Sequence, residues 1–169
     1  VTTIKGESYL THRVLLAIGR RGTPRKLNVP GEHLEKVAYK LLEPELIHGK
    51  NIVVAGGGDS AIESALLLAG DNKVILTYRG ETFSRLKPLN AINIQDAVNR
   101  KNIKVIFGSN IKEITEKSVI LILDDGTSMT VDNDLVYIFA GGELPTQFLQ
   151  KAGIEISKRF NYTMLAHKK

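Results

Sequence analysis

Residues 50–70 read KNIVVAGGGDSAIESALLLAG, and they carry the strongest structural signal in the chain. Its first part, Asn51–Ala55, is an apolar run of strand length, and three consecutive glycines follow it directly. From about Ser60 to Ala69 the apolar residues recur with the spacing of a helix. The stretch therefore predicts a buried strand, a tight glycine turn and a helix that starts at the turn.

The glycine turn has the pattern G-x-G-x-x-A, which is a dinucleotide-binding fingerprint when a strand precedes it and a helix follows. Gly56 permits the sharp turn off the strand, and Gly58 lacks a Cβ atom, so the backbone there would lie close to a pyrophosphate. The helix N-terminus would offer free N–H groups to the phosphates, with Asp59 or Ser60 as its cap and Ser60 within reach of a phosphate. The alternative interpretation is a tight turn that binds nothing. The candidate binding residues of the turn are Gly56, Gly57, Gly58, Asp59, Ser60 and Ala61, the last being small enough to let the helix pack on the sheet.

Short apolar strands alternate with helical stretches on both sides of this turn, which is typical of an α/β fold. Residues 110–131 differ, because they offer three short strands joined by tight turns, with Asp124–Gly126 as a hairpin signal. We therefore expect a Rossmann-like parallel sheet with helices on both faces and an antiparallel β-meander. Further strands are expected at residues 14–18, 72–80, 103–108 and 135–139, and further helices at residues 32–46, 89–102 and 147–152.

The residues at the end of the second strand indicate which nucleotide would bind. An acidic residue at this place favours NAD, whereas a basic one accommodates the 2′-phosphate of NADP. The strand ends at Thr77 with Tyr78 and Arg79, and Arg85 and Lys87 follow. We therefore predict NADPH in preference to NADH, with Tyr78 or Arg79 covering the adenine. In the alternative interpretation Arg79 is a surface residue balanced by Glu81.

The composition excludes several other classes of protein. The chain has 169 residues and a net charge of +5, but its basic residues are spread out, so we expect no nucleic-acid partner. It has no cysteine, and its four histidines lack metal-ligand spacing, so no metal site is expected. Neither a membrane-spanning apolar stretch nor a signal peptide is present, and we expect a cytoplasmic protein. Because the first residue is Val1, we expect a processed or excised piece.

Three stretches, in this order, resemble the FAD-dependent pyridine nucleotide-disulfide oxidoreductases, and specifically their thioredoxin-reductase branch. They are VLLAIGRRGTPRKLNVPGE at residues 14–32, VVAGGGDSAIESALLLA at residues 53–69 and YIFAGGELPTQFLQKAGIEI at residues 137–156. The resemblance implies two dinucleotide-binding domains, with the NAD(P)H domain inserted into the FAD domain.

The resemblance divides the chain into three segments. Residues 1–30 would end the first FAD segment and form the crossover, residues 31–142 would be the NAD(P)H domain, and residues 143–169 would begin the returning FAD segment. It also places Gly19 and Gly141 at the two domain crossovers, with Gly19 near the flavin. Glu63 would lie near the nicotinamide. The resemblance is compatible with a homodimeric full-length parent protein.

The chain departs from this family pattern at several positions. Lys40 and Glu43 stand about where the branch places a C-x-x-C pair, so this chain cannot exchange dithiols with its own residues. Within the family's phosphate signature, Tyr78 replaces a histidine, Gly80 replaces the second arginine, and Arg85 is offset by one position. The flavin-binding motifs at the two ends of the family are missing from the chain.

The function implied by the resemblance is that of the NAD(P)H domain of a cysteine-less flavoprotein. Hydride would pass from the nicotinamide to the FAD of the full-length parent, and then to an unidentified acceptor. Family members without the cysteine pair reduce ferredoxin, flavodoxin or small disulfides. Two alternatives are a stand-alone nucleotide-sensing module and a short-chain dehydrogenase. The dehydrogenase needs a Tyr-x-x-x-Lys pair, which none of the five tyrosines forms.

Overall fold

The structure, a computed structural model, describes residues 1–15, 24–142 and 146–155. The chain divides into two compact units. One unit is Pro24–Gly141, and it contains both sheets. The other combines Val1–Thr23 with Gly142–Lys169. The candidate site described below lies entirely within the first unit.

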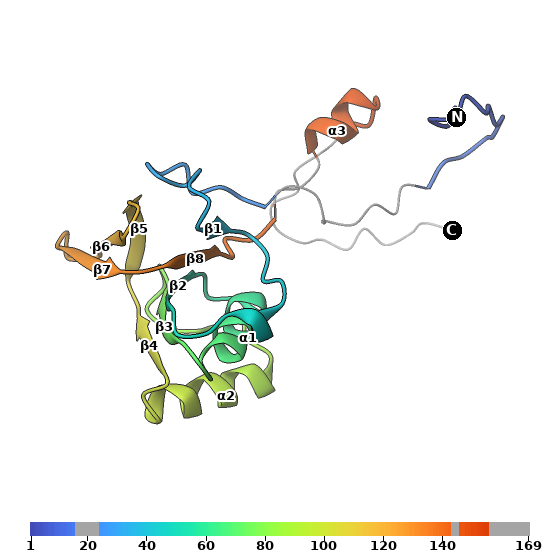
Figure 1. The fold of residues 1–169 in the computed structure, drawn as a ribbon. Coiled ribbons are helices and arrows are strands. Elements are labelled where there is room, and N and C mark those ends of the chain that lie inside the picture. The colour runs from blue at the N-terminus through green and yellow to red at the C-terminus, as the bar shows by residue number, and fades with distance from the viewer. Residues whose placement is uncertain (16–23, 143–145, 156–169) are drawn as a thin grey trace. The chain divides into compact units, whose positions relative to one another are not determined.

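Five parallel strands form the central sheet of this unit, in the order β1-β8-β2-β3-β4 (Figure 1). Their bounds are β1 Val37–Ala38, β2 Asn51–Ala55, β3 Lys73–Thr77, β4 Ile103–Ile106 and β8 Leu135–Ile138. The register places Val53 of β2 opposite Ile75 of β3 on one side and Val136 of β8 on the other. The strands predicted at residues 51–55, 72–80, 103–108 and 135–139 are thereby confirmed, with ends that differ by at most three residues.

Two helices, α1 (Asp59–Leu68) and α2 (Pro88–Asn99), pack on one face of the parallel sheet (Figure 1). Ile52 and Val54 of β2 point to this face, because alternate residues of a strand point to opposite faces. They meet Ile62 and Leu68 of α1, whose side chains are fully buried. This apolar contact is what holds α1 against the sheet.

The other face of the sheet is covered by a three-stranded antiparallel sheet rather than by helices. It consists of β5 (Ser109–Ile114), β6 (Ser118–Leu123) and β7 (Ser128–Asp132), as the meander pattern predicts. Val53 and Val136 of the parallel sheet pack against Val119 and Leu121 of β6. The α/β fold class is confirmed. The expectation that helices cover both faces of the parallel sheet is not met, because both helices of this unit lie on one face. The meander fills the second face because its own alternate residues are apolar.

The helix expected at residues 32–46 is wrong. The chain instead forms a turn, the short strand β1 and a single 3₁₀ turn, η1 (Pro44–Leu46). Glu32, which is 8% exposed, accepts hydrogen bonds from the backbone N–H groups of Leu27 at 2.7 Å and Asn28 at 2.6 Å, and from the Tyr39 hydroxyl at 2.7 Å. A buried carboxylate with these partners fixes a loop, and β1 then pairs with the distant strand β8. Tertiary pairing overrides the local helical pattern here.

These hydrogen bonds control the protonation of the Glu32 side chain. Burial by itself raises the pKa of the carboxyl, but the bonds from Leu27, Tyr39 and Asn28 outweigh it and hold the pKa below its ordinary value of 4.5. Burial and the hydrogen bond to Glu32 raise the pKa of Tyr39 to about 12. Glu32 therefore stabilises the fold as a carboxylate, with Tyr39 as its neutral donor.

Replacing Glu32 with Ala is expected to lower the free energy of unfolding by about 3 kcal/mol at pH 7, because the backbone N–H groups of Leu27 and Asn28 and the Tyr39 hydroxyl lose their acceptor. Since folding lowers the pKa, the contribution of the carboxylate is complete above pH 4.5 and is lost as the pH falls through the folded-state value. Urea unfolding at several pH values measures this, and the difference from the unmodified protein should shrink in acid. Exposed Glu35→Ala is the control. Equal stabilities of the two variants at pH 7 would contradict the assignment.

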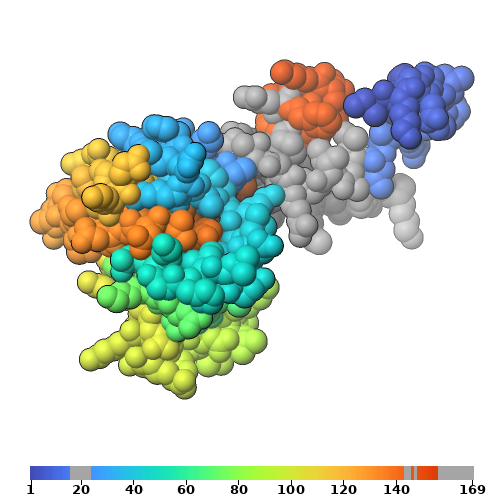
Figure 2. Space-filling model, viewed as in Figure 1, coloured from blue at the N-terminus to red at the C-terminus, as the bar shows by residue number. Residues whose placement is uncertain are grey.

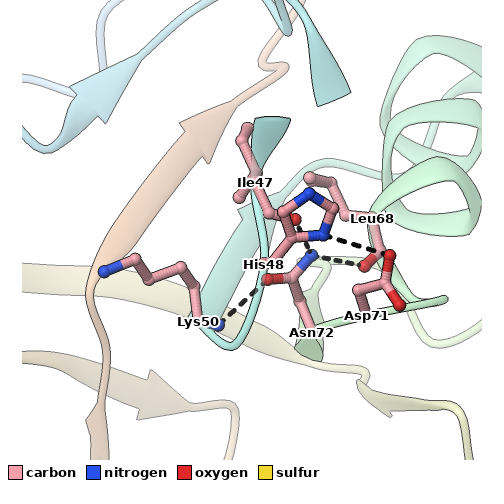
Figure 3. Close-up of polar contacts among 6 residues, drawn as sticks. All are labelled: Ile47, His48, Lys50, Leu68, Asp71 and Asn72. Atoms are coloured by element: carbon pink, nitrogen blue, oxygen red, sulfur yellow. Dashed lines mark hydrogen bonds and ion pairs between the residues drawn. The ribbon is translucent and has the colours of Figure 1, made fainter. Parts of the chain in front are cut away.

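Asn72 aligns the beginnings of the two central strands (Figure 3). Its Nδ2 group donates to the carbonyl oxygens of Ile47 at 2.7 Å and Leu68 at 2.9 Å, and its Oδ1 atom accepts from the N–H of Lys50 at 2.9 Å. The end of α1 and the turn before β3 are thereby tied to the chain that enters β2. These hydrogen bonds hold the beginnings of β2 and β3 next to each other. The register of the two strands in turn positions the glycine turn at the other end of β2.

In the second unit, α3 (Thr146–Lys151) confirms the short helix predicted near residues 147–152. The strand predicted at residues 14–18 falls mostly outside the described residues, as does Gly19, and the described Val14 and Leu15 are not in a strand. Within the described ranges, no helix has the length and apolar character that crossing a bilayer requires. The same residues contain no cluster of potential metal ligands.

Candidate functional site

The carboxyl ends of four strands meet at one edge of the parallel sheet and enclose a cavity of about 360 Å³. After β2 the chain turns toward β3, while β8 lies on the other side of β2. This is the topological switch point, where open α/β sheets bind their ligands. The cavity is lined by Arg25, Leu27, Ala55, Gly56, Gly57, Gly58, Thr77, Tyr78, Arg79, Arg85, Ser109, Asn110, Ile111, Phe139, Ala140 and Gly141.

The three glycines of the turn differ in what surrounds them. Gly56 has a φ angle of +145°, and a Cβ atom there would lie 2.7 Å from the carbonyl oxygen of Phe139, so only glycine fits without strain. A Cβ atom on Gly57 would lie 2.3 Å from the ring of Tyr78. Gly58 has an ordinary extended backbone, and a Cβ atom on it would meet no atom within 4 Å. The turn is therefore packed tightly at Gly56 and Gly57 and open to a ligand at Gly58.

The N-terminus of α1 carries no side-chain cap. Gly58 occupies the cap position, and its carbonyl accepts from the N–H groups of Ala61 at 3.0 Å and Ile62 at 3.1 Å. The expectation that Asp59 or Ser60 caps the helix is therefore wrong, because the Asp59 carboxylate accepts its hydrogen bonds from the start of α2. An uncapped helix N-terminus at the cavity is an anion-binding feature.

An aromatic stack supports Tyr78, which lines the cavity next to the turn. The Tyr78 ring lies against Gly57 and stacks on Phe83, with ring centroids 5.7 Å apart and planes inclined by 16°. Phe107 packs edge-on against Phe83, with centroids 4.9 Å apart. The stack holds the half-buried Tyr78 ring at the cavity wall.

The charges at the cavity have one sign. Three arginines, Arg25, Arg79 and Arg85, are among its lining residues, and the described lining includes no aspartate or glutamate. The backbone of Arg25 is held by the hydrogen bond from its N–H to the carbonyl of Gly141, at 3.0 Å. The site therefore favours an anionic ligand.

Two buried hydroxyl groups lie at the strand ends beneath the cavity. The Oγ1 atom of Thr77 and the Oγ atom of Ser109 are 2.6 Å apart, and Ser109 donates to the carbonyl of Ile106 at 2.7 Å. The sequence interpretation missed Thr77 and Ser109, as well as Arg25 and Phe139. Thr77 and Ser109 could have been found from the sequence, because Thr77 lies near the end of one predicted parallel strand and Ser109 follows the next one.

The structure brings only part of the predicted site residues to the cavity. Gly56, Gly57, Gly58, Tyr78, Arg79, Arg85 and Gly141 line it. Ala61 is buried under the turn. Its Cβ atom lies 3.1 Å from the place that a Cβ atom on Gly56 would occupy. Ala61 thus packs the helix closely against the turn, as expected. Ser60 is exposed at the start of α1.

Three other predicted residues, Asp59, Glu63 and Lys87, face α2 instead. The Asp59 carboxylate accepts from the backbone N–H of Lys87 at 2.9 Å, and this bond, followed by one from Asn90, lowers the pKa of Asp59. Glu63 accepts from Asn90 at 2.8 Å, and the Lys87 ammonium lies 3.6 Å from the Glu63 carboxylate. These residues connect the two helices beside the cavity.

These observations define a Rossmann-type α/β domain with a cationic cavity at its switch point. The sequence model of one family, described as pyridine nucleotide-disulphide oxidoreductase, matches residues 1–167. The bacilliredoxin reductase Bdr of Bacillus subtilis (strain 168) is 33% identical over 154 residues, which cover 90% of this chain and 48% of that protein. A ferredoxin–NADP reductase of Ignicoccus hospitalis is 28% identical over 161 residues, covering 91% of this chain and 51% of that protein.

Solved structures agree with this result. The bacillithiol disulfide reductase Bdr of Bacillus cereus has a TM-score of 0.77 and 34% identity, and the match covers 80% of this chain and 42% of that one. The chain belongs to the pyridine nucleotide-disulphide oxidoreductase family, as the three sequence stretches indicated. It spans about half the length of the curated relatives that it matches.

Proposed function

We propose that the unit Pro24–Gly141 is the NAD(P)H-binding domain of an FAD-dependent oxidoreductase and that it prefers NADPH. The observation that carries the proposal is the open position at Gly58, which lies at the uncapped N-terminus of α1 and at the edge of the cationic cavity. A glycine without neighbours at this position leaves room for a pyrophosphate next to the backbone N–H groups of α1.

The residues of the cavity fit the other parts of such a nucleotide. Arg79 and Arg85 follow β3, where a 2′-phosphate would lie, and a guanidinium group suits a phosphate through its fork of donors. The Tyr78 ring would cover the adenine. The absence of a carboxylate from the described lining leaves the ribose hydroxyls of NADH without their usual acceptor.

The reaction that this domain would serve is hydride transfer, in which the nucleotide supplies the hydride and FAD accepts it. The described residues of this unit hold and orient the nucleotide, and none of them is assigned as a general acid or base. The chain has no cysteine, so an acceptor disulfide cannot be reduced by a dithiol of these 169 residues. We propose that the residues outside this unit, Val1–Thr23 and Gly142–Lys169, belong to the FAD domain, with Gly19 and Gly141 at the crossovers. The names of the relatives point to a disulfide or a ferredoxin as the class of acceptor.

Titration calorimetry of the 169-residue chain with NADPH and with NADH tests the proposed binding. NADPH is expected to bind more tightly, and Arg79→Ala should weaken NADPH binding on the order of tenfold with little effect on NADH, because one charge-assisted contact to the 2′-phosphate is lost. Arg100→Ala is the control, since Arg100 is exposed on the far end of α2 and pairs with Asp96. Equal or tighter binding of NADH would refute the preference for NADPH.

A further inference from the structure

The segment between β3 and α2, residues 78–87, carries both Arg79 and Arg85 to the cavity. Its first half continues the sheet, because the N–H of Tyr78 donates to the carbonyl of Ile106 at 3.0 Å and the carbonyl of Gly80 accepts from Gly108 at 3.2 Å. Arg79 lies between these bonds, so the sheet itself positions Arg79. Arg85 lies beyond them and needs another anchor.

The anchor of the second half is Asp59. Its Oδ1 atom accepts from the backbone N–H of Lys87 at 2.9 Å and from the Nδ2 group of Asn90 at 2.7 Å. The same Nδ2 group donates to Glu63 at 2.8 Å, and Asn90 is 7% exposed. One amide nitrogen therefore joins the start of α2 to two carboxylates of α1.

We propose that Asp59 and Asn90 are positioning residues that determine the preference for NADPH by holding Arg85 at the cavity. Arg85 precedes the anchored N–H of Lys87 by two residues, and Asp59 directly follows the open glycine Gly58. The same carboxylate therefore fixes the distance between the place for the pyrophosphate and the place for the 2′-phosphate. This inference rests on the proposed nucleotide function.

Charge and positioning predict effects of opposite sign when Asp59 is replaced. By charge alone, removing a carboxylate near an anion site strengthens the binding of an anion. If Asp59 acts by positioning, Asp59→Ala weakens NADPH binding although it makes the site more positive. Asp59→Asn keeps an oxygen acceptor for both donors while removing the charge, so it should bind NADPH at least as tightly as the unmodified chain.

The experiment measures the dissociation constants of NADPH and NADH for the full 169-residue chain by titration calorimetry. We expect Asp59→Ala to weaken NADPH binding on the order of tenfold, to change NADH binding less than about twofold, and to be rescued by Asp59→Asn. Asp96→Ala removes the same charge from the exposed side of α2, where Asp96 pairs with Arg100, and should change neither constant. Thermal unfolding confirms that each variant is folded.

A double-mutant cycle with Arg85→Ala tests whether Asp59 acts through Arg85. In the Arg85→Ala background, Asp59→Ala should have no further effect on NADPH binding, whereas independent roles would give additive losses. If Asp59→Ala keeps or tightens NADPH binding, or if the losses are additive, the positioning role is refuted. If the unmodified chain binds neither nucleotide, or binds both equally, that result refutes the proposed function itself. The positioning role of Asp59 is then refuted as well.

Discussion

Replacing Gly58 with Val is expected to weaken NADPH binding by about 100-fold or more while the protein stays folded. A Cβ atom at Gly58 meets no protein atom within 4 Å, so the added side chain projects into open space at the start of α1. That space is where the pyrophosphate would approach the N–H groups of the helix. The backbone at Gly58, with φ at −98° and ψ at 173°, is one that valine adopts readily.

Titration calorimetry with NADPH and thermal unfolding measure the two parts of this prediction. Gly70→Val is the matched control, because Gly70 lies after the other end of α1 and a Cβ atom there also meets nothing within 4 Å. It should fold equally well and bind NADPH normally. A folded Gly58→Val variant with unchanged affinity would show that the nucleotide does not bind at this turn.

The largest effect on stability is expected from replacing Gly31 with Ala. Gly31 lies in the segment before β1, which contacts β5 through the hydrogen bond from the N–H of Ile114 to the carbonyl of Pro30, at 2.9 Å. Figure 2 shows the atoms of this segment, in blue, packed against those of the antiparallel sheet, in yellow and orange. A Cβ atom on Gly31 would lie 1.7 Å from the carbonyl oxygen of Ile114, and the φ angle of Gly31 is +79°.

Because the neighbouring atom belongs to the backbone of a strand, it cannot move aside without disturbing the sheet. We expect Gly31→Ala to lower the free energy of unfolding by about 4 kcal/mol, from the sum of backbone strain and steric overlap. Gly126→Ala isolates the strain, since Gly126 has a φ angle of +82° with no atom near its Cβ position, and should cost about 1–2 kcal/mol. Urea unfolding compares the two variants. Equal losses would mean that the contact with β5 is not close.

Much of the fold could be predicted because its signals are local. The apolar run Asn51–Ala55, the three glycines and the helix after them are contiguous, and the structure places each of them within a residue of its expected bounds. The hairpin signal at Asp124–Gly126 is equally local, and it lies in the turn between β6 and β7. Tyr78, Arg79 and Arg85 could be placed at the cavity because the carboxyl ends of adjacent parallel strands share one edge of the sheet.

The incorrect expectations concern residues whose partners are distant in the chain. Glu32 suited a helix by its pattern, but strand β1 behind it pairs with β8, about a hundred residues later. Asp59 suited a helix cap, but its carboxylate bonds to Asn90, which is 31 positions away. The residues within one helix length of Glu32 or Asp59 in the sequence do not indicate either of these contacts.

Local sequence patterns were enough to predict four of the five strands of the parallel sheet, the antiparallel meander and the place of the three-glycine turn. Two features could be seen only in the folded protein: a second sheet, rather than helices, covers one face of the parallel sheet, and Asp59 connects two helices. The reason is physical. Propensity, periodicity and glycine conformation act within a few residues, whereas packing and buried hydrogen bonds depend on which distant segments the fold brings together.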